Sequence, residues 1–273
     1  MKFPSISLDF PDFLFQKNSL VFYRCVRELF RIGKKIVSKT VRAHIIKKEF
    51  SMRKTIFDDG FQSYLTENAS FDGRDGIPKL YDTNNAEIPQ RLVSFNKAKS
   101  DLLKTGYVHF YTHDSQYGDF LANTKKYIPL LRQFDGVITP DPTIIIGKSR
   151  CLHATSTYMN RAIGFYLQTQ GIPVIPNVRW GDPSTYEFCF LGVPKGSVVS
   201  IGTHGAIARD KSTNNLLRNY FKHGLKEMLI RLEPKDVIVY GYMPDDIFGD
   251  FKNKTRFHRF PSEFEQTHKK GGN

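Results

Sequence analysis

A repeated alternation of short apolar strands with helical segments is the feature of this sequence that most constrains its fold. The strands are expected at 107–111, 135–139, 172–176, 197–201 and 236–240, with a possible last strand at 256–260. The helices are expected at 119–132, 155–170, 183–191 and 213–232. The strands are β-branched and nearly unbroken, as in a parallel sheet that is buried on both faces. The pattern predicts an α/β fold with a mainly parallel sheet of about five to six strands, as an open sheet or a partial or closed barrel.

The N-terminal part of the chain differs from this core in its charge. Residues 17–54 contain twelve Lys and Arg and two Glu, which gives this segment +10 of the chain's formal net charge of +13. Apolar residues recur there near helical spacing, so residues 1–57 are expected to form a basic amphipathic helical extension. Such a helix suits an arm for nucleic acid or for a membrane surface, or it packs on the domain with a solvated basic face. Met52 offers a second start, so residues 1–51 also fit a dispensable extension.

Turn-forming residues separate this extension from the core. Residues 58–90 are rich in Asp, Gly and Asn and are expected to be a linker. The core is expected at 88–261, and residues 262–273 are expected to form a flexible tail. Three widely spaced cysteines without a CxxC or Cys/His cluster indicate neither disulfides nor a zinc site. No apolar run approaches the roughly 20 residues that span a bilayer, so a cytoplasmic protein is expected.

Polar residues follow each expected strand. In α/β folds the carboxyl ends of parallel strands lie along one edge, so groups that are distant in sequence converge there. The polar residues expected at this edge are His113, Asp114, Asp141, Asn177, Arg179, Asp182, Thr203, His204 and Asp245. The sequence therefore predicts a site at the carboxyl edge of the sheet.

The stretch "PNVRWGD" contributes the strongest binding candidates. A guanidinium at the exit of an apolar strand needs a carboxylate, an aromatic face or an anionic ligand, so Arg179 either contacts a ligand or forms an internal ion pair with Asp141 or Asp182. Trp180 offers a stacking surface for a base. The full set of predicted substrate-binding residues is Asn177, Arg179, Trp180, Gly202, Thr203, Gly205 and Arg161.

Three residues are predicted to act in catalysis. His204 lies in the turn "GTHG" and has an ordinary pKa near neutrality, which suits a general acid or base. Asp141 directly follows a buried strand, where catalytic acids are often found. Asp182 precedes a proline at a helix start, so it is either a helix N-cap or a catalytic acid. Together with Asp114, these two carboxylates form a candidate site for a divalent cation such as Mg²⁺.

Several blocks of the sequence resemble a known family. The blocks are "FDGVITPD", "NRAIGFYLQTQGIPVIPNVRWGD", "YEFCFLGVPKGSVVSIGTHG" and "RLEPKDVIVYG", in this order within residues 88–261. Together they resemble an uncharacterised family of bacterial, archaeal, phage and plasmid proteins, a domain of unknown function. Pro142 and Thr143 stand where that family usually has Phe-Ser. The resemblance implies no activity, but its association with mobile elements favours work on nucleic acid.

Three functions fit these observations. The first is an enzyme acting on a phosphate-containing substrate, nucleic acid or nucleotide, in a phage or plasmid context; Arg179 would neutralise transition-state charge and His204 would move a proton. The second is a noncatalytic nucleic-acid-binding protein, a replication accessory or regulator, whose basic arm dominates affinity. The third is a small-molecule enzyme on a barrel-like fold.

Overall fold

The computed structural model describes residues 62–83, 86–203, 207 and 215–270. The chain divides into two compact units, Met1–Gln62 and Ser63–Asn273, and every described helix and strand belongs to the second. The basic extension predicted at 1–57 therefore lies outside the described residues.

Seven parallel strands form two sheets. The first sheet has the order β3 (Leu92–Ser94), β4 (Tyr107–His109), β5 (Gly136–Ile138) and β6 (Val174–Ile175). The second has the order β7 (Val199–Gly202), β8 (Asp236–Tyr240) and β9 (Arg256–Phe260). A parallel bridge between Asn177 and Ser200 joins the two sheets, so all seven strands follow one another in chain order. The predicted parallel α/β fold is confirmed.

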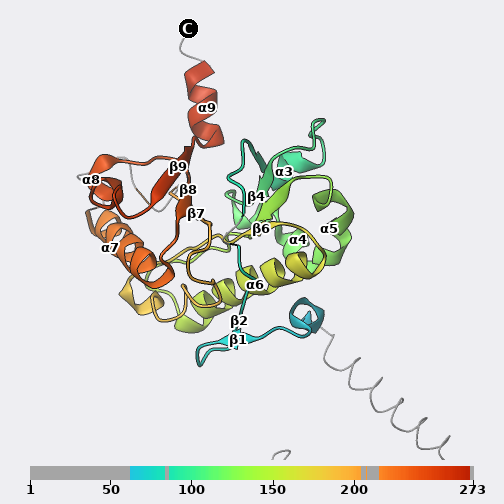
Figure 1. Ribbon diagram of the computed structural model, residues 1–273, viewed down its shortest axis with the longest axis horizontal. Coiled ribbons are helices and arrows are strands. Elements are labelled where there is room, and N and C mark those ends of the chain that lie inside the picture. Colours follow the sequence, from blue (N-terminus) through green and yellow to red (C-terminus); the bar gives the residue numbers. More distant parts are fainter. Residues whose placement is uncertain (1–61, 84–85, 204–206, 208–214, 271–273) are drawn as a thin grey trace, which may run out of the picture. The chain divides into compact units, whose positions relative to one another are not determined.

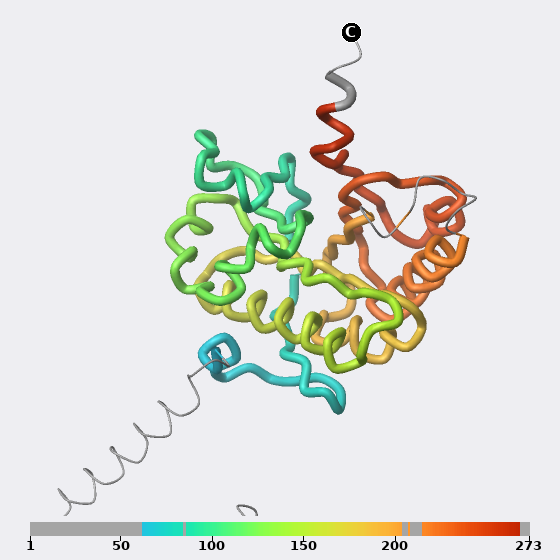
Figure 2. Tube along the Cα trace, turned by 180° about the vertical axis from the view of Figure 1, so that it is seen from behind, coloured from blue at the N-terminus to red at the C-terminus, as the bar shows by residue number. Residues whose placement is uncertain are grey.

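Helical segments connect successive strands. In chain order they are α3 (Phe95–Ala98), η4 (Asp114–Gln116), α4 (Gly118–Ala122), α5 (Thr124–Leu131), α6 (Arg150–Thr169), η5 (Pro183–Thr185), α7 (Asn215–Leu232), α8 (Asp245–Phe248) and η6 (Gly249–Phe251), with α9 (Glu263–Lys270) after the last strand. Figure 1 shows α7 and α8 beside β7 to β9, with α4 and α5 on the side of β4. In Figure 2, seen from behind, α6 runs past both sheets.

Side chains alternate between an outer and an inner face of the strands, as the period of two requires. On β8, Val237 and Val239 pack in a cluster with residues of α7. Ile238 and Tyr240 point the other way and pack in a cluster with residues of β4, β5 and β6. Both faces are therefore apolar, which explains why the strands read as nearly continuous hydrophobic runs.

The sheet curves strongly but does not close. The rings of Tyr111, just after β4, and Tyr240, at the end of β8, stack with centroids 4.9 Å apart, although these strands are not neighbours. Within the described residues no ladder joins β9 to β3. Instead, Lys97 on α3 and Glu263 on α9 form an ion pair of 2.8 Å across this seam. Of the shapes left open by the sequence, an open curved sheet is the one observed.

Three helices differ from the sequence prediction. The helix expected at 119–132 is divided into α4 and α5 at Asn123. The segment expected to be helical at 183–191 is reduced to the short η5, which begins after Asp182. The helix expected at 155–170 begins earlier, at Arg150, because the hydroxyl of Ser149 accepts a hydrogen bond from the backbone N–H of Cys151.

The two segments that flank the predicted core also contain regular structure. In the expected linker, η3 (Ser63–Thr66) and the antiparallel pair β1 (Phe71–Asp72) and β2 (Ile77–Pro78) bury Leu65 and Ile77. In the expected tail, α9 begins with a capping box, in which the Glu265 carboxylate accepts from the backbone N–H of Ser262 at 2.9 Å and the Ser262 hydroxyl accepts from the N–H of Glu265 at 3.3 Å.

Candidate functional site

An ion pair lies at the carboxyl edge of the first sheet. Asp141 follows β5 and Arg179 follows β6, and an Nη1 of Arg179 donates to Oδ2 of Asp141 at 2.6 Å. Asn177 completes the contact, because its Nδ2 donates to Oδ1 of the same carboxylate at 2.8 Å. The charge of Asp141 raises the pKa of Arg179, and the charge of Asp114 acts in the same direction. The structure thus brings together three of the predicted site residues.

A second set of hydrogen bonds holds Asn177 in place from the inner face. The hydroxyl of Tyr111 donates to Oδ1 of Asn177 at 3.0 Å and lies 2.6 Å from the hydroxyl of Ser200. The backbone N–H of Asn177 donates to the hydroxyl of Thr139 at 2.7 Å. Burial raises the pKa of Tyr111 well above its ordinary value, so the phenol stays neutral. This network fixes the amide that contacts Asp141.

Arg161 has a structural environment. It lies on α6, is almost completely buried, and donates to the main-chain carbonyls of Leu191 at 3.0 Å, Cys189 at 2.9 Å and Asn177 at 2.9 Å. Burial lowers its pKa to about 10. Because its guanidinium is bonded to carbonyls of the connection after β6, Arg161 positions the loop that carries Arg179. Its predicted contact with substrate stays a prediction.

Trp180 and Asp182 each have structural partners in the described part of the chain. Trp180 is 7% exposed and its ring packs between Phe190 and Phe221 in the outer core. Asp182 caps η5, since its carboxylate accepts from the backbone N–H of Ser184 at 2.9 Å. The N-cap alternative for Asp182 is therefore the one with a visible partner, and its catalytic role stays a prediction.

The carboxylate of Asp114 is held by its neighbours. It accepts from the backbone N–H of Thr143 at 3.0 Å, from the Thr143 hydroxyl at 2.8 Å and from the Tyr117 hydroxyl at 3.0 Å. In the described part of the chain, no group of three or more His, Cys, Asp or Glu side chains is arranged to hold a metal ion. The divalent cation predicted at Asp114, Asp141 and Asp182 therefore has no ligand set in that part.

The "GTHG" turn is described only in part. Gly202 ends β7, and a side chain there would collide with the ring of Tyr111. Thr203 donates its hydroxyl to the carbonyl of Tyr240 at 3.2 Å. His204 and Gly205, predicted as the acid–base residue and a substrate-binding residue, lie outside the described residues.

A pocket of about 370 Å³ opens beside Arg179. It is lined by Thr143, Ile144, Ile145, Ile146, Arg179, Trp180, Gly181, Leu217, Tyr220 and Phe221. Most of these side chains are apolar or aromatic, and Arg179 is the charged one among them. Such a lining suits a ligand with a flat apolar part and an anionic group.

The sequence did not single out Tyr111 and Ser200 as site residues. Their role depends on which strands become neighbours and on the inner orientation of both side chains, neither of which a single strand reveals. Ser200 carries a weak signal, because a hydroxyl in the middle of the buried strand "SVVSI" needs a partner. His109 on β4 is also on the inner face, and burial lowers its pKa to about 4.

No helix in the described part of the chain combines the length and the apolar composition needed to cross a membrane.

The family described as Domain of unknown function (DUF4417) matches residues 69–261. Proteins of similar sequence include two called Gene 1 protein, from Mycobacterium phages D29 and L5. The D29 protein is 27% identical over 196 residues, 71% of this chain and 69% of the phage protein. The L5 protein is 30% identical over 138 residues, 50% of this chain and 58% of the phage protein. No solved structure matches this chain.

Proposed function

Because this chain belongs to the family described as Domain of unknown function (DUF4417) and has relatives in two mycobacteriophages, we propose that it is an enzyme of a mobile genetic element. Its substrate contains phosphate, as nucleic acid or as a nucleotide, and binds at the carboxyl edge of the sheet. The supporting observation is that Asp141 holds the guanidinium of Arg179 in position, while other N–H groups of this guanidinium have no hydrogen-bond partner among the described residues.

Arg179 has donors to spare for an anion. Its guanidinium carries five N–H groups, and among the described residues its one hydrogen bond is to Asp141. The side chain is 24% exposed and borders the pocket described above. A guanidinium oriented by a carboxylate on one side and open on the other is suited to a phosphate, which takes two parallel hydrogen bonds from an arginine.

The remaining groups have proposed roles around this arginine. Trp180 and Tyr220 provide apolar walls for a base or sugar. Arg179 stabilises negative charge that develops on the phosphate, and Asp141 and Asn177 keep the guanidinium in position. His204, which follows the strand next to this site, is proposed to transfer the proton. Divalent metal chemistry is common in phosphoryl transfer, and substrate oxygens would have to complete any ligand set near Asp114 and Asp141.

Titration with nucleoside mono-, di- and triphosphates and with a short single-stranded DNA, followed by calorimetry, tests this proposal. Arg179→Lys keeps the charge but removes the fork, so affinity should fall roughly 10- to 100-fold. Asp141→Asn removes the competing carboxylate, so affinity should be retained or increased while turnover falls. Arg256→Lys is the matched control, because Arg256 pairs with Asp236 at the other edge of the sheet.

Equal affinities in Arg179→Lys and Arg256→Lys would contradict the anion site.

A noncatalytic nucleic-acid-binding protein is favoured by one specific observation, the charge of +10 on residues 17–54. In that case, removing residues 1–51 should make the dependence of log affinity on log salt much shallower, whereas Arg179→Lys should leave it unchanged. Binding only of a small anion without phosphate would favour the small-molecule enzyme on a barrel-like fold.

A further inference from the structure

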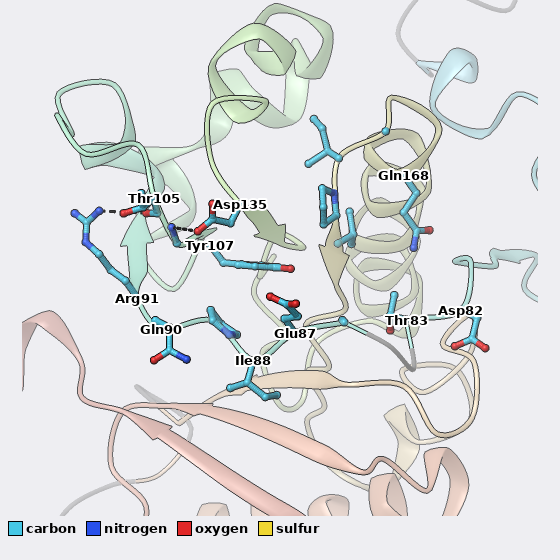
Figure 3. Close-up of a pocket in the computed structure, with 17 residues that line it drawn as sticks. Asp82, Thr83, Glu87, Ile88, Gln90, Arg91, Thr105, Tyr107, Asp135 and Gln168 are labelled. Atoms are coloured by element: carbon cyan, nitrogen blue, oxygen red, sulfur yellow. Dashed lines mark hydrogen bonds between the residues drawn. The ribbon is translucent and has the colours of Figure 1, made fainter.

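A cavity of about 800 Å³ lies at the amino ends of β4, β5 and β6, at the opposite edge of the sheet from Arg179. Figure 3 shows its lining. Its polar lining includes Glu87, Arg91, Thr105, Tyr107 and Asp135. Its volume is in the range of cavities that hold small organic ligands.

Tyr107 projects into this cavity from the first residue of β4. The residue is 6% exposed, yet its hydroxyl has no hydrogen-bond partner among the described residues. Figure 3 shows the ring reaching across the pocket, with its hydroxyl toward the interior. The ring lies over Gly136 of β5, where a Cβ atom would collide with it. The residue is thus packed over most of its surface, while its hydroxyl is presented to the cavity, where it can donate a hydrogen bond to a ligand and accept one from it.

Two carboxylates line the cavity together with the phenol. In Figure 3 the carboxylate of Glu87 lies near the Tyr107 hydroxyl, whereas that of Asp135 lies toward the backbone end of the ring. Burial raises the pKa of Tyr107, and the charges of Asp135 and Glu87 act in the same direction. Glu87 has no ion-pair or hydrogen-bond partner among the described residues. Asp135 accepts one hydrogen bond there, from the backbone N–H of Gly106 at 2.6 Å. Among the described residues, both carboxylates therefore have lone pairs without a hydrogen-bond donor, and both line the same cavity.

The cation in the lining does not neutralise them. Arg91 pairs with Asp101, which is outside the lining, and donates to the carbonyl of Thr105 at 3.2 Å. In Figure 3 its guanidinium lies at the edge of the pocket, away from Glu87. The cavity is thus negative although the chain carries a formal net charge of +13. Apolar side chains, including Ile88 and Ile172, line the rest of it.

We propose that this cavity binds an organic cation, an alkylammonium or guanidinium group. The cation contacts Glu87 and Asp135 and donates to the hydroxyl of Tyr107, whose ring contributes a cation–π contact. The alkyl part lies against Ile88 and Ile172. The same chemistry is offered by a free polyamine and by a lysine or arginine side chain of a peptide. This site does not depend on the proposed function at Arg179.

Calorimetric titration of the full chain with spermidine and with a blocked lysine peptide tests the proposal. Glu87→Gln, at an exposed position, should reduce affinity for the preferred probe about tenfold, and Tyr107→Phe should reduce it several-fold. Glu67→Gln, the same change elsewhere on the surface, and Arg179→Lys should leave it unchanged. Thermal melting of each variant shows whether the fold is retained.

The two probes identify the source of the cation. Tighter binding of spermidine indicates a free amine, and tighter binding of the peptide indicates a polypeptide side chain. Two results would overturn the proposal: no heat with either probe, or an equal loss of affinity in Glu87→Gln and Glu67→Gln, which would mean diffuse attraction only. Nucleotide binding that fails at Arg179 would leave this result unaffected, because the two edges are tested with ligands of opposite charge.

Discussion

Two Arg–Asp pairs lie at opposite edges of the sheet, and they differ in how completely the arginine is used. The carboxylates are buried alike, with Asp141 9% and Asp236 8% exposed. The arginine of the carboxyl edge, Arg179, is 24% exposed and forms one hydrogen bond to its partner. The arginine of the amino edge, Arg256, is 74% exposed but binds through both Nε, at 2.8 Å, and Nη2, at 2.7 Å.

The difference distinguishes an ion pair that connects two strands from an ion pair whose arginine can also bind a ligand. Arg256 starts β9 and Asp236 starts β8, so their two parallel bonds connect neighbouring strands. His258 adds a third contact to the same carboxylate at 2.6 Å. Asp236 is thus well satisfied, because Arg256 and His258 together give it three contacts. Asp141 is satisfied by one arginine donor and one amide, and its arginine has donors left for a ligand.

The largest expected difference is in stability after the loss of each arginine. Among the described residues, Arg179→Ala leaves the buried carboxylate of Asp141 with the amide of Asn177 as its one partner, and it should lower the free energy of unfolding by about 3 kcal/mol. Arg256→Ala leaves Asp236 with His258 and removes an exposed side chain, so the loss should be about 1 kcal/mol. Urea denaturation measures both. Equal losses would show that the two pairs are equivalent in the fold.

A smaller effect is expected from the inner network behind the open pair. Tyr111→Phe removes the hydroxyl between Asn177 and Ser200, and it should cost about 1 kcal/mol of stability. Tyr127→Phe is the matched control, because its hydroxyl binds Asp119 at an exposed position and should matter little. If Tyr111→Phe is as stable as the control, the network does not hold the amide of Asn177.

The smallest effect should be seen only in acid. Burial alone would raise the pKa of Asp236, but the hydrogen bonds from Arg256 and His258 lower it below its ordinary value. A lowered pKa means that this carboxylate stabilises the fold above its unfolded pKa of about 3.9, and that the contribution is lost as pH falls through the folded value. The stability difference between the wild type and Asp236→Asn should therefore narrow below about pH 4. A constant difference would disprove this assignment.

Local signals explain what the sequence could predict. The strands at 236–240 and 256–260 are found at the expected residues, because β-branched and aromatic runs report burial within the segment itself. The convergence of Asp141, Asn177 and Arg179 followed from the rule that parallel strands end along one edge.

What required the structure is information that no segment contains. The partner of Arg179 was one of several possibilities until the order of the strands was known. The network of Tyr111, Asn177 and Ser200 depends on curvature, which brings residues of distant strands to one inner face. The tail is an instructive exception: "SEFE" fits the capping-box pattern, with Ser262 and Glu265 at the required spacing, so the start of α9 was visible in the sequence.

The order of the strands has a consequence for how the chain is made. Each strand from β4 to β9 pairs with the strand that precedes it in the sequence. A chain emerging from the ribosome can therefore add each strand to a partner that has already been synthesised. The contacts between paired strands join neighbouring segments of the sequence. The ion pair between Lys97 and Glu263 joins the beginning of the sheet to its end, so that contact must wait until Glu263 has been synthesised.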